Sequence, residues 1–437
     1  MNNQKSLLLK LLCALSIMMV FVGSVHAETS DVPDTYTLKE VVVLSRHGIR
    51  SPLSNPGSPL DKSTPHDWYE WSSDVSELSL RGGMLETKMG QYFRKWVTSE
   101  GLLPENYRSE SDDIRFYANA IQRTIATANY FSSGFLPVAD IPIEINSPYG
   151  ETDTNFIPEL KYLSEDLAKD AEAQMKEKIP DLTENYELLM DVLDYKESDG
   201  YKSGELKELV KGDDTFKLEV GKEPATSGSL RSATSLCDAL VLQYYEEADP
   251  KKAAFDHDLT SEQWTKISHI KEVYNNVLFG TPLLAPILAN DTLKVIQSEL
   301  SEKDRKFTFL CGHDSTLGSV LASLHAEPYT LPDSIEENVP IGAKLVFEKW
   351  ADQGGKEFYR IRMVYQSTDQ LRSLSILSLD NPPKDYVLAF EGLKANQDGL
   401  YPAEDFRKLL QSSIDRFDEI RKEYNIEPAA IPDTGVR

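Results

Sequence analysis

Cysteine, long apolar runs and positive charge are all scarce in this chain, and each shortage excludes a class of protein. The chain has three cysteines in 437 residues, and Cys13 lies in an N-terminal apolar segment. The other two, Cys237 and Cys311, allow one disulfide at most, so the fold is not a disulfide scaffold. Both stand in apolar contexts, and we favour two buried free thiols over a bridge.

Positive charge is the second shortage. Lysine and arginine number 46 against 71 aspartates and glutamates, which gives a formal net charge of −25. So acidic a protein is a poor ligand for nucleic acid or for an anionic membrane surface, and we expect neither as a partner. Any site for a phosphorylated small molecule has to be a local cluster of cations in an unfavourable overall field.

A long apolar run occurs only near the N-terminus. Lys5 and Lys10 precede the apolar residues 11–22, a stretch too short for a comfortable membrane span, and Ala27 ends a small-residue cleavage signal. We predict a signal peptide over residues 1–27, and no stable membrane association after its cleavage. An uncleaved anchor helix is the alternative, but no basic stop follows the run.

Two short motifs, far apart in the chain, each follow an apolar run. Residues 45–52 read SRHGIRSP and follow the run at 41–44, and residues 311–315 read CGHDS and follow the run at 307–310. Short runs rich in β-branched and aromatic residues are typical of buried strands in a parallel sheet. Ligands of open α/β sheets bind beyond the carboxyl ends of the strands. We therefore expect the two motifs to meet at one edge of a sheet.

The side chains of these motifs suit the hydrolysis of a phosphate monoester. Arg46 and Arg50 can bind phosphoryl oxygens, because a guanidinium stays charged and bonds phosphate bidentately. His47, as a neutral imidazole, can attack phosphorus and form a phosphohistidine that water then hydrolyses. Asp314 can protonate the leaving alkoxide and afterwards activate water. His313 can donate a further hydrogen bond to the phosphoryl group.

The same residues predict an acidic pH optimum. The neighbouring arginines disfavour the imidazolium form of His47 and so lower its pKa. Asp314 has to begin protonated while His47 begins neutral, and both conditions hold together only in mildly acidic medium.

A third arginine belongs to the same edge of the sheet. Residues 114–118 predict a strand, and Arg123 follows it closely enough to join Arg46 and Arg50. Three guanidinium groups would neutralise the phosphoryl oxygens without a metal, and no dense Asp/His cluster with metal-ligand spacing is obvious. We expect no metal and no other cofactor. Taken alone, Arg123 would be read as a surface helix residue.

The rest of the pattern indicates an α/β fold with a helical insertion. Before the insertion, helical spacing predicts helices at 80–97 and 121–131. From about 158 to 247 the pattern is helical, for example at 159–179 and 184–195, with no strong strand signal.

Sheet signals return after this helical region. The expected elements are a strand at 306–310, an antiparallel hairpin near the sheet edge (342–350 and 356–366, turning at 352–355) and a closing helix at 402–424. We predict a discontinuous α/β domain, residues 28–150 and 265–437, with an inserted all-helical domain, residues 151–264.

A family resemblance rests on these motifs. Residues 46–52 resemble the RHGxRxP signature of the histidine acid phosphatases, and His313 with Asp314 resembles their distal HD pair. Further segments resemble the bacterial periplasmic glucose-1-phosphatases, a branch of that family related to the bacterial phytases. These segments are residues 63–65, 117–119, 122–128, 242–246 and 340–342.

The resemblance implies a phosphoglycerate mutase-like sheet domain with an inserted helical domain and the site in the cleft between them. It implies a periplasmic enzyme and metal-free hydrolysis through a phosphohistidine on His47, with Asp314 as the proton donor. The phosphate ligands that it implies are Arg46, Arg50, Arg123 and His313.

The substrate is indicated by weaker signals. Phytases of this family commonly place Thr, often followed by Lys, after the motif's proline, where this chain has Leu53 and Ser54. Lys62 is the only lysine or arginine in residues 53–71, whereas an inositol carrying six phosphates would want more cations. We therefore favour small sugar phosphates, such as glucose 1-phosphate, over inositol phosphates.

Glu223 matches an acidic position in the helical domain of glucose-1-phosphatases. There it could hydrogen-bond sugar hydroxyls and repel additional phosphates, although a solvated loop carboxylate is an equal alternative. The histidines outside the motifs are interpreted as structural or surface residues, namely His66, His257, His269 and His325.

Two further functions compete with a phosphatase. A mutase-like phosphotransferase shares the Arg-His-Gly start, but the export signal and the distal His-Asp pair argue against it. A phosphosugar-binding protein without turnover would be expected to lack a catalytic residue type, and none is missing here.

Overall fold

The computed structural model describes residues 32–54, 58–109, 112–137 and 139–427. The predicted signal peptide lies outside these ranges. Within them, no helix combines the length and the apolar character that crossing a membrane requires.

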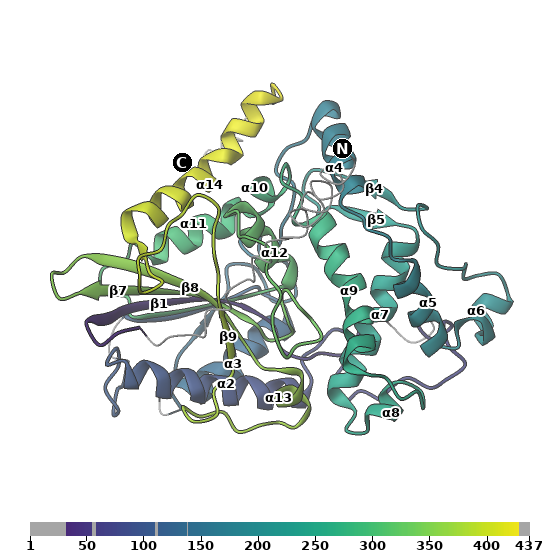
Figure 1. Cartoon of the computed structure of the whole chain (residues 1–437), viewed down its shortest axis with the longest axis horizontal. Helices are drawn as coiled ribbons and strands as arrows, with labels where there is room; N and C mark the ends of the chain where they lie inside the picture. Colours follow the sequence, from purple (N-terminus) through teal and green to yellow (C-terminus); the bar gives the residue numbers. More distant parts are fainter. Residues whose placement is uncertain (1–31, 55–57, 110–111, 138, 428–437) are drawn as a thin grey trace, which may run out of the picture. The chain divides into compact units, whose positions relative to one another are not determined.

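A mixed eight-stranded sheet forms the centre of the fold (Figure 1), in the order β10-β8-β7-β1-β6-β2-β3 with β9 also paired to β8. Strands β1, β6, β2 and β3 run parallel, and β7 to β10 join by antiparallel pairing. The predicted parallel strands and the hairpin near the sheet edge are confirmed. The bounds are β1 (Tyr36–Arg46), β2 (Ile114–Ala118), β3 (Ile143–Glu144), β6 (Phe307–Gly312), β7 (Lys344–Asp352), β8 (Glu357–Tyr365), β9 (Lys384–Val387) and β10 (Tyr401–Pro402).

Helices cover both faces of this sheet (Figure 1). On one face α3 packs on α2, β2 and β6, and on the other α12 packs on β1 and α14 on β8. The predicted helices at 80–97, 121–131 and 402–424 are confirmed. The helices that cover the sheet or border it are α2 (Leu80–Ser99), α3 (Gln122–Phe135), α10 (Ala285–Leu288), α11 (Asn290–Glu299), α12 (Asp314–Ser323), α13 (Thr368–Arg372) and α14 (Ala403–Glu423).

The two central strands are apolar on both sides, which explains their continuous hydrophobic runs. Val42 and Leu44 of β1 join a core cluster with Leu310 of β6 and residues of α11, α12 and α14. On the opposite face Phe309 stacks on Phe131 of α3, with 4.3 Å between ring centroids. Alternate residues of one strand thus fill two cores, and this fixes the register of β1 against β6.

The segment between the two halves of the sheet is mostly helical and has its own apolar core. One expectation is wrong in part, because β4 (Thr215–Lys217) and β5 (Ala225–Ser227) form a small antiparallel pair. These strands are short and largely exposed, so they lack the apolar alternation that would reveal them. The other elements are α4 (Glu165–Glu177), α5 (Thr183–Val192), a 3-10 turn η1 (Tyr195–Glu197), α6 (Asp199–Lys202), α7 (Ser229–Glu246), α8 (Pro250–Ala253) and α9 (Ser261–Leu278).

Two details of the helical segment differ from expectation. The helix predicted from residue 159 begins at Glu165, because the Ser164 side chain accepts a hydrogen bond from Leu167 N and caps it. The domain boundary predicted at residue 264 falls inside α9. The division into an α/β domain and an inserted domain stays a prediction.

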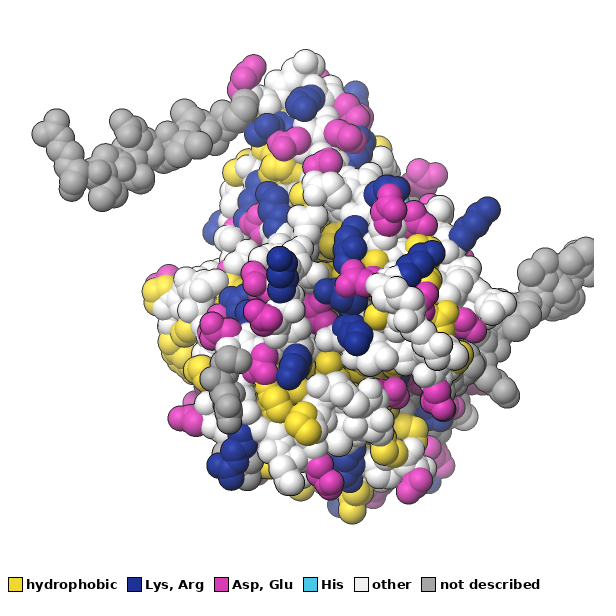
Figure 2. Space-filling model, turned by 90° about the vertical axis from the view of Figure 1, so that its left-hand side faces the viewer, with side chains coloured by type: hydrophobic (Ala, Val, Ile, Leu, Met, Phe, Trp, Pro, Cys, Tyr) yellow, Lys and Arg dark blue, Asp and Glu magenta, His cyan; other side chains and the backbone are white. Residues whose placement is uncertain are grey.

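Charge is dispersed on the face of the molecule shown in Figure 2, where acidic and basic side chains are interspersed. Cys237 and Cys311 are buried and free, as we favoured.

Inside the β7–β8 hairpin, Glu348 is fully buried and accepts from two arginines, Arg360 Nε at 2.7 Å and Arg362 Nε at 2.5 Å.

We predict that Glu348→Gln destabilises the protein by roughly 3–5 kcal/mol, because it leaves the buried Arg360 without a counter-charge and Arg362 with Asp385 alone. Urea unfolding followed by fluorescence measures the change. The matched control is Glu357→Gln, whose partner Arg407 is half-exposed, and which should cost no more than about 1 kcal/mol. Equal losses in the two variants would contradict the argument.

Candidate active site

The two motifs meet at the carboxyl edge of the sheet, the edge formed by the C-terminal ends of β1, β6 and β2. Arg46 lies opposite Gly312 in the parallel ladder, and the next residue, His47, donates its backbone N–H to the Gly312 carbonyl at 3.1 Å. The rings of His47 and His313 lie edge to face with 5.5 Å between centroids. Both histidines are buried. The expected meeting of the motifs is confirmed.

A cavity of about 290 Å³ opens at this edge, bounded on its other side by α7 and α9. Of the predicted site residues, Arg46 alone lies behind its wall, where it lines a small neighbouring cavity. The predicted residues that line the main cavity are His47, Arg50, Arg123, Glu223, His313 and Asp314.

Hydrogen bonds fix the tautomers of both histidines. His47 Nδ1 lies 2.9 Å from the Gly48 carbonyl, which can only accept, so Nδ1 carries the proton and Nε2 keeps its lone pair. Asn119 Oδ1 accepts from Asp153 N, so Asn119 Nδ2 donates to His313 Nε2 at 2.8 Å. His313 therefore carries its proton on Nδ1. One ring offers a nucleophilic nitrogen and the other a hydrogen-bond donor.

The three arginines differ in their ion-pair partners. Arg46 pairs with Glu336 at 2.7 Å and with Asp314 at 3.3 Å. Arg50 pairs with Asp238 at 2.9 Å. Among the described residues Arg123 has no ion-pair partner, and its buried Nε lacks a hydrogen bond. Arg123 is thus a cation available for an incoming anion.

The cations and burial together keep the imidazoles neutral. Burial, followed by the positive charges of Arg123 and Arg50, lowers the pKa of His47 well below its usual value. Burial and Arg123 act on the pKa of His313 in the same direction. Burial and then Arg50 also lower the pKa of Arg123, to about 10, so Arg123 stays charged at neutral and acidic pH. The expected neutral His47 is confirmed.

Asp314 departs from expectation, because its ion pairs favour the ionised form. Burial raises its pKa, but Lys271 and Arg46 lower it by more, and the net pKa lies well below the usual value. Lys271 Nζ lies 3.1 Å from Asp314 Oδ2. The requirement that Asp314 begins protonated stays a prediction about the complex with substrate, since these ion pairs favour its carboxylate form.

Glu223 lines the mouth of the cavity. The residue as a whole is exposed to solvent, but surrounding protein atoms partly desolvate its carboxylate. Ser315 Oγ approaches its Oε1 at 3.5 Å. Desolvation and the charge of Asp314 raise the pKa of Glu223 to about 7. Glu223 is thus mainly neutral in mildly acidic medium, so its capacity to repel phosphates grows as the pH rises toward 7 and beyond.

Two charged residues of the site were missed by the sequence reasoning. Asp238 of α7 binds both Arg50 and Lys271, and Lys271 of α9 bridges Asp238 and Asp314. Asp238 interrupts an apolar stretch, residues 236–242, and this interruption is a usable signal. Lys271 is one of two lysines on its helix, with Lys266, and carries no such signal.

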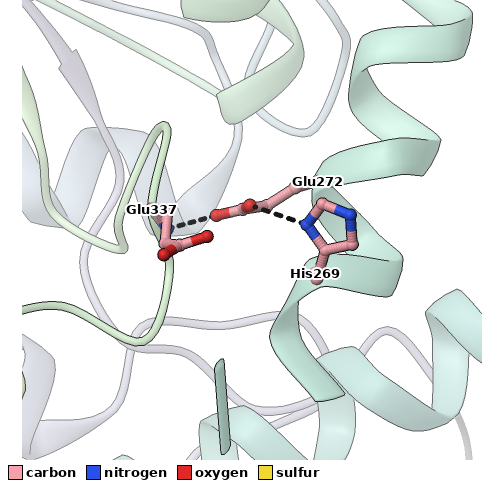
Figure 3. Close-up of side chains that lie close together, drawn as sticks. All are labelled: His269, Glu272 and Glu337. Carbon is pink, nitrogen blue, oxygen red and sulfur yellow. Dashed lines mark hydrogen bonds and ion pairs between the residues drawn. The ribbon is translucent and has the colours of Figure 1, made fainter. Parts of the chain in front are cut away.

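Helix α9 also carries part of a second cluster, formed by His269, Glu272 and Glu337 (Figure 3). Glu272 accepts the backbone N–H groups of Glu337 and Asn338, and His269 Nδ1 lies 3.5 Å from its Oε2. One ligand atom from each of His269, Glu272 and Glu337 falls within 4.8 Å of the others, which is compact enough for a cation. The Glu272 carboxylate is already used to hold the loop, and the spacing His-x-x-Glu on a helix was the missed signal.

The loop held by Glu272 also carries an active-site residue. Glu336 binds Arg46 and also accepts from Tyr245 Oη at 3.2 Å and Ile341 N at 2.9 Å. The contact in Figure 3 therefore fixes the position of α9 relative to the counter-ion of Arg46.

Comparison with known families agrees with this geometry. The model of the histidine phosphatase superfamily (branch 2) matches residues 37–366. The chain belongs to this superfamily.

The relatives of this phosphatase are similar over nearly their whole length. A glucose-1-phosphatase of Salmonella typhimurium is 35% identical over 398 residues, which are 90% of this chain and 95% of the relative. A glucose-1-phosphatase of Providencia rettgeri is 34% identical over 413 residues, 93% of this chain and 98% of the relative. The structure of Hafnia alvei phytase in its apo form superposes with a TM-score of 0.80 at 26% identity, over 89% of this chain and 99% of that chain.

These findings confirm the expected fold class and the reaction. The protein is a histidine-type acid phosphatase, a hydrolase of phosphoric monoesters.

We predict that Asn119→Ala lowers kcat/KM of this phosphatase roughly 10- to 100-fold, because His313 loses the partner that fixes its tautomer. Steady-state kinetics on a phosphate monoester measures the loss, and thermal unfolding measures any loss of folded protein. Asn155→Ala is the matched control, since Asn155 donates to Tyr117 and not to His313. A similar kinetic loss in both variants would refute the orienting role.

Proposed function

We propose that this acid phosphatase hydrolyses the monophosphates of small sugars, glucose 1-phosphate among them, through a phosphohistidine on His47. The observation that carries the proposal is the state of His47, which is neutral with a free Nε2 beside the cation cluster of the cavity. A neutral imidazole among cations is suited to attack a phosphoryl group whose negative charge those cations bind.

The first chemical step forms the bond from His47 Nε2 to phosphorus and breaks the bond from phosphorus to the ester oxygen. Asp314 in its acid form gives its proton to the departing alkoxide, which leaves as an alcohol. In the second step water attacks phosphorus, gives a proton to Asp314 and breaks the N–P bond, so that phosphate is released.

The remaining predicted residues bind the phosphoryl group. Arg50 and Arg123 contact it from the cavity wall, Arg46 supports it from behind, and His313 donates from Nδ1. The residues proposed to do so together are Arg46, Arg50, Arg123 and His313. A rigid set of donors aimed at one point stabilises the charge of the transition state without reorganisation.

The cavity mouth supports a small, uncharged leaving group. Leu53 lines the mouth and is 58% exposed, an apolar contact where a cation would serve a polyphosphate. Lys62 lies in an exposed ion pair with Glu205 at 2.8 Å. Glu223 can exchange hydrogen bonds with sugar hydroxyls, and similarity to two glucose-1-phosphatases supports the same substrate class.

An inositol phosphate is the second candidate substrate. The likeness to a phytase structure favours it, although at lower identity than the glucose-1-phosphatases. The cavity is also open enough to admit a larger leaving group.

We also propose that residues 1–27 are a signal peptide and that the mature enzyme works in the periplasm, without nucleic acid or membrane as a partner. The acidic surface charge supports the last point, since it opposes binding to either polyanion.

We predict that the purified enzyme at about pH 5 releases phosphate from glucose 1-phosphate with a higher kcat/KM than from inositol hexakisphosphate. His47→Ala should lower the rate by more than about 1,000-fold, since the nucleophile is lost, while still binding inorganic phosphate. Phosphate release measured by a colorimetric assay decides both points.

The opposite preference would move the substrate to the inositol phosphates. Undiminished turnover by His47→Ala would remove the proposed nucleophile, and an enzyme that binds glucose 1-phosphate without releasing phosphate would be a binding protein.

We predict that Glu223 makes substrate preference depend on pH. Because its pKa is raised to about 7, the carboxyl is mostly neutral at about pH 5 and becomes charged toward pH 7. The preference for glucose 1-phosphate over inositol hexakisphosphate should therefore rise several-fold between these pH values.

In Glu223→Gln the remaining rise reports only the ionisation of the substrates themselves. The matched control is Glu219→Gln, which removes an exposed carboxylate of the same segment that is paired with Lys217. If wild type and Glu223→Gln show the same pH trend, Glu223 does not discriminate between the substrates.

A further inference from the structure

We propose that Lys271 is a positioning residue that keeps the Asp314 carboxylate ion-paired in the empty site, so that the proton for the leaving group arrives on the phosphate of the substrate. The proposal rests on the proposed role of Asp314 as proton donor. It adds that the enzyme selects the monoanion of a phosphate monoester.

Both carboxylate oxygens of Asp314 contact neighbouring protein groups. Oδ2 lies 3.1 Å from Lys271 Nζ and 3.3 Å from Arg46 Nη2, and Oδ1 accepts from Ser315 N at 3.0 Å. A proton on Oδ2 would face two cations within ion-pair distance. These contacts therefore favour the carboxylate form of Asp314, which has no proton to donate before substrate binds.

Lys271 is held in place by more than Asp314. Asp238 of α7 binds its ammonium group, and the adjacent Glu272 anchors α9 to the loop whose Glu336 binds Arg46. Lys271 is largely buried, with a side chain 13% exposed. Because Lys271 is paired with Asp238 as well, its ammonium group stays in place when the Asp314 carboxylate moves.

The effects of nearby cations outweigh those of nearby carboxylates around Asp314. The negative groups Asp238 and Glu336 are each committed to a cation, and Glu223 is mostly neutral below pH 7. The charged and titratable groups that face Asp314 are Lys271 of α9, Arg46 and His47 of β1 and its end, Arg123 of α3, Asp238 of α7, Glu336 and Glu223.

The proton balance follows from this arrangement. The second pKa of a phosphate monoester is about 6, so the monoanion carries one proton into the site in mildly acidic medium. Transfer of that proton to Asp314 leaves a phosphate dianion among the arginines and a neutral acid beside it. Attack by His47 then breaks the ester bond, and the same proton leaves with the alcohol.

Wild-type kinetics test the proposal without any variant. The alkaline limb of the kcat/KM profile should follow the second pKa of the substrate, so an aryl phosphate with a lower pKa should show a limb at lower pH than glucose 1-phosphate. A group of the free enzyme would give both substrates the same limb. Coincident limbs would overturn the proposal.

The variant test removes the cation. In Lys271→Met, Asp314 keeps a proton more readily, so the acid limb of kcat/KM should move to higher pH by about one unit or more, while the alkaline limb stays with the substrate. Lys271→Arg should restore the acid limb. The matched control is Lys266→Met, which removes an equal charge from the same helix at an exposed pair with Glu184.

A folded, active Lys271→Met enzyme with an unmoved acid limb would overturn the role of Lys271. If that variant does not unfold cooperatively, the comparison of two substrates in wild type still decides the monoanion claim. Failure of the proposed function would look different, because His47→Ala would then retain turnover.

A binding measurement gives an independent readout. Sulfate resembles the phosphate dianion but brings no proton at about pH 5, so its binding to wild type should take up about one proton, measured by calorimetry in two buffers of different ionisation enthalpy. Asp314→Asn should abolish the uptake. Binding of sulfate to wild type without proton uptake would contradict the proposal.

Discussion

The parallel pairing of β1 with β6 is the constraint on which the rest of the structure depends. It places His47 and His313 side by side although 266 positions separate them, and the bond from His47 N to the Gly312 carbonyl extends the ladder into the site. Both strands are buried on both faces, so a shift of one residue would move apolar side chains to the wrong core. The hydrophobic packing of the sheet therefore sets the geometry of the catalytic pair.

Once the strands are paired, the arginines bring a second constraint. Several guanidinium groups and one ammonium group at one edge would repel each other strongly. Carboxylates from the helices and a loop offset this repulsion. Asp238, Asp314 and Glu336 pair with Arg50, Lys271 and Arg46, whereas Arg123 forms no ion pair with any described residue. The site is thus preorganised for an anion while its repulsion is largely compensated.

This division explains what could be predicted from the sequence. Residues at the ends of apolar strands are placed by a general rule of α/β sheets, so the positions of His47, His313 and Arg123 followed from local pattern. Lys271 and Asp238 lie on helices whose packing against the sheet edge depends on tertiary contacts. No local pattern tells which of the two lysines of α9 lines the cavity.

The same limit applied to the secondary structure. The strong periodic elements were predictable, whereas the three-residue strands β4 and β5 carry too little apolar pattern to be seen. The Glu272 contact likewise joins residues 65 positions apart along the chain through backbone N–H groups, which any residue provides.

The missed lysine changes how the acid–base chemistry is understood. In many enzymes the environment pushes the pKa values of an acid and a base apart, so that each begins in its working form. Burial and then the arginines lower the pKa of His47, whereas Lys271 and Arg46 lower the pKa of Asp314 against the effect of burial. In the proposed mechanism the nucleophile is therefore ready for attack, but the acid lacks its proton until substrate binds.

A site that binds phosphate through fixed cations cannot easily avoid this outcome, since the cations that add to the effect of burial on His47 also favour the ionised form of a carboxyl beside it. The negative charge of the substrate resolves the conflict, because it weakens that field only when phosphate is bound. If the proposal holds, the acidic optimum predicted from the sequence has a different cause. It then follows from the ionisation of the substrate, and the acid form of Asp314 exists only in the complex.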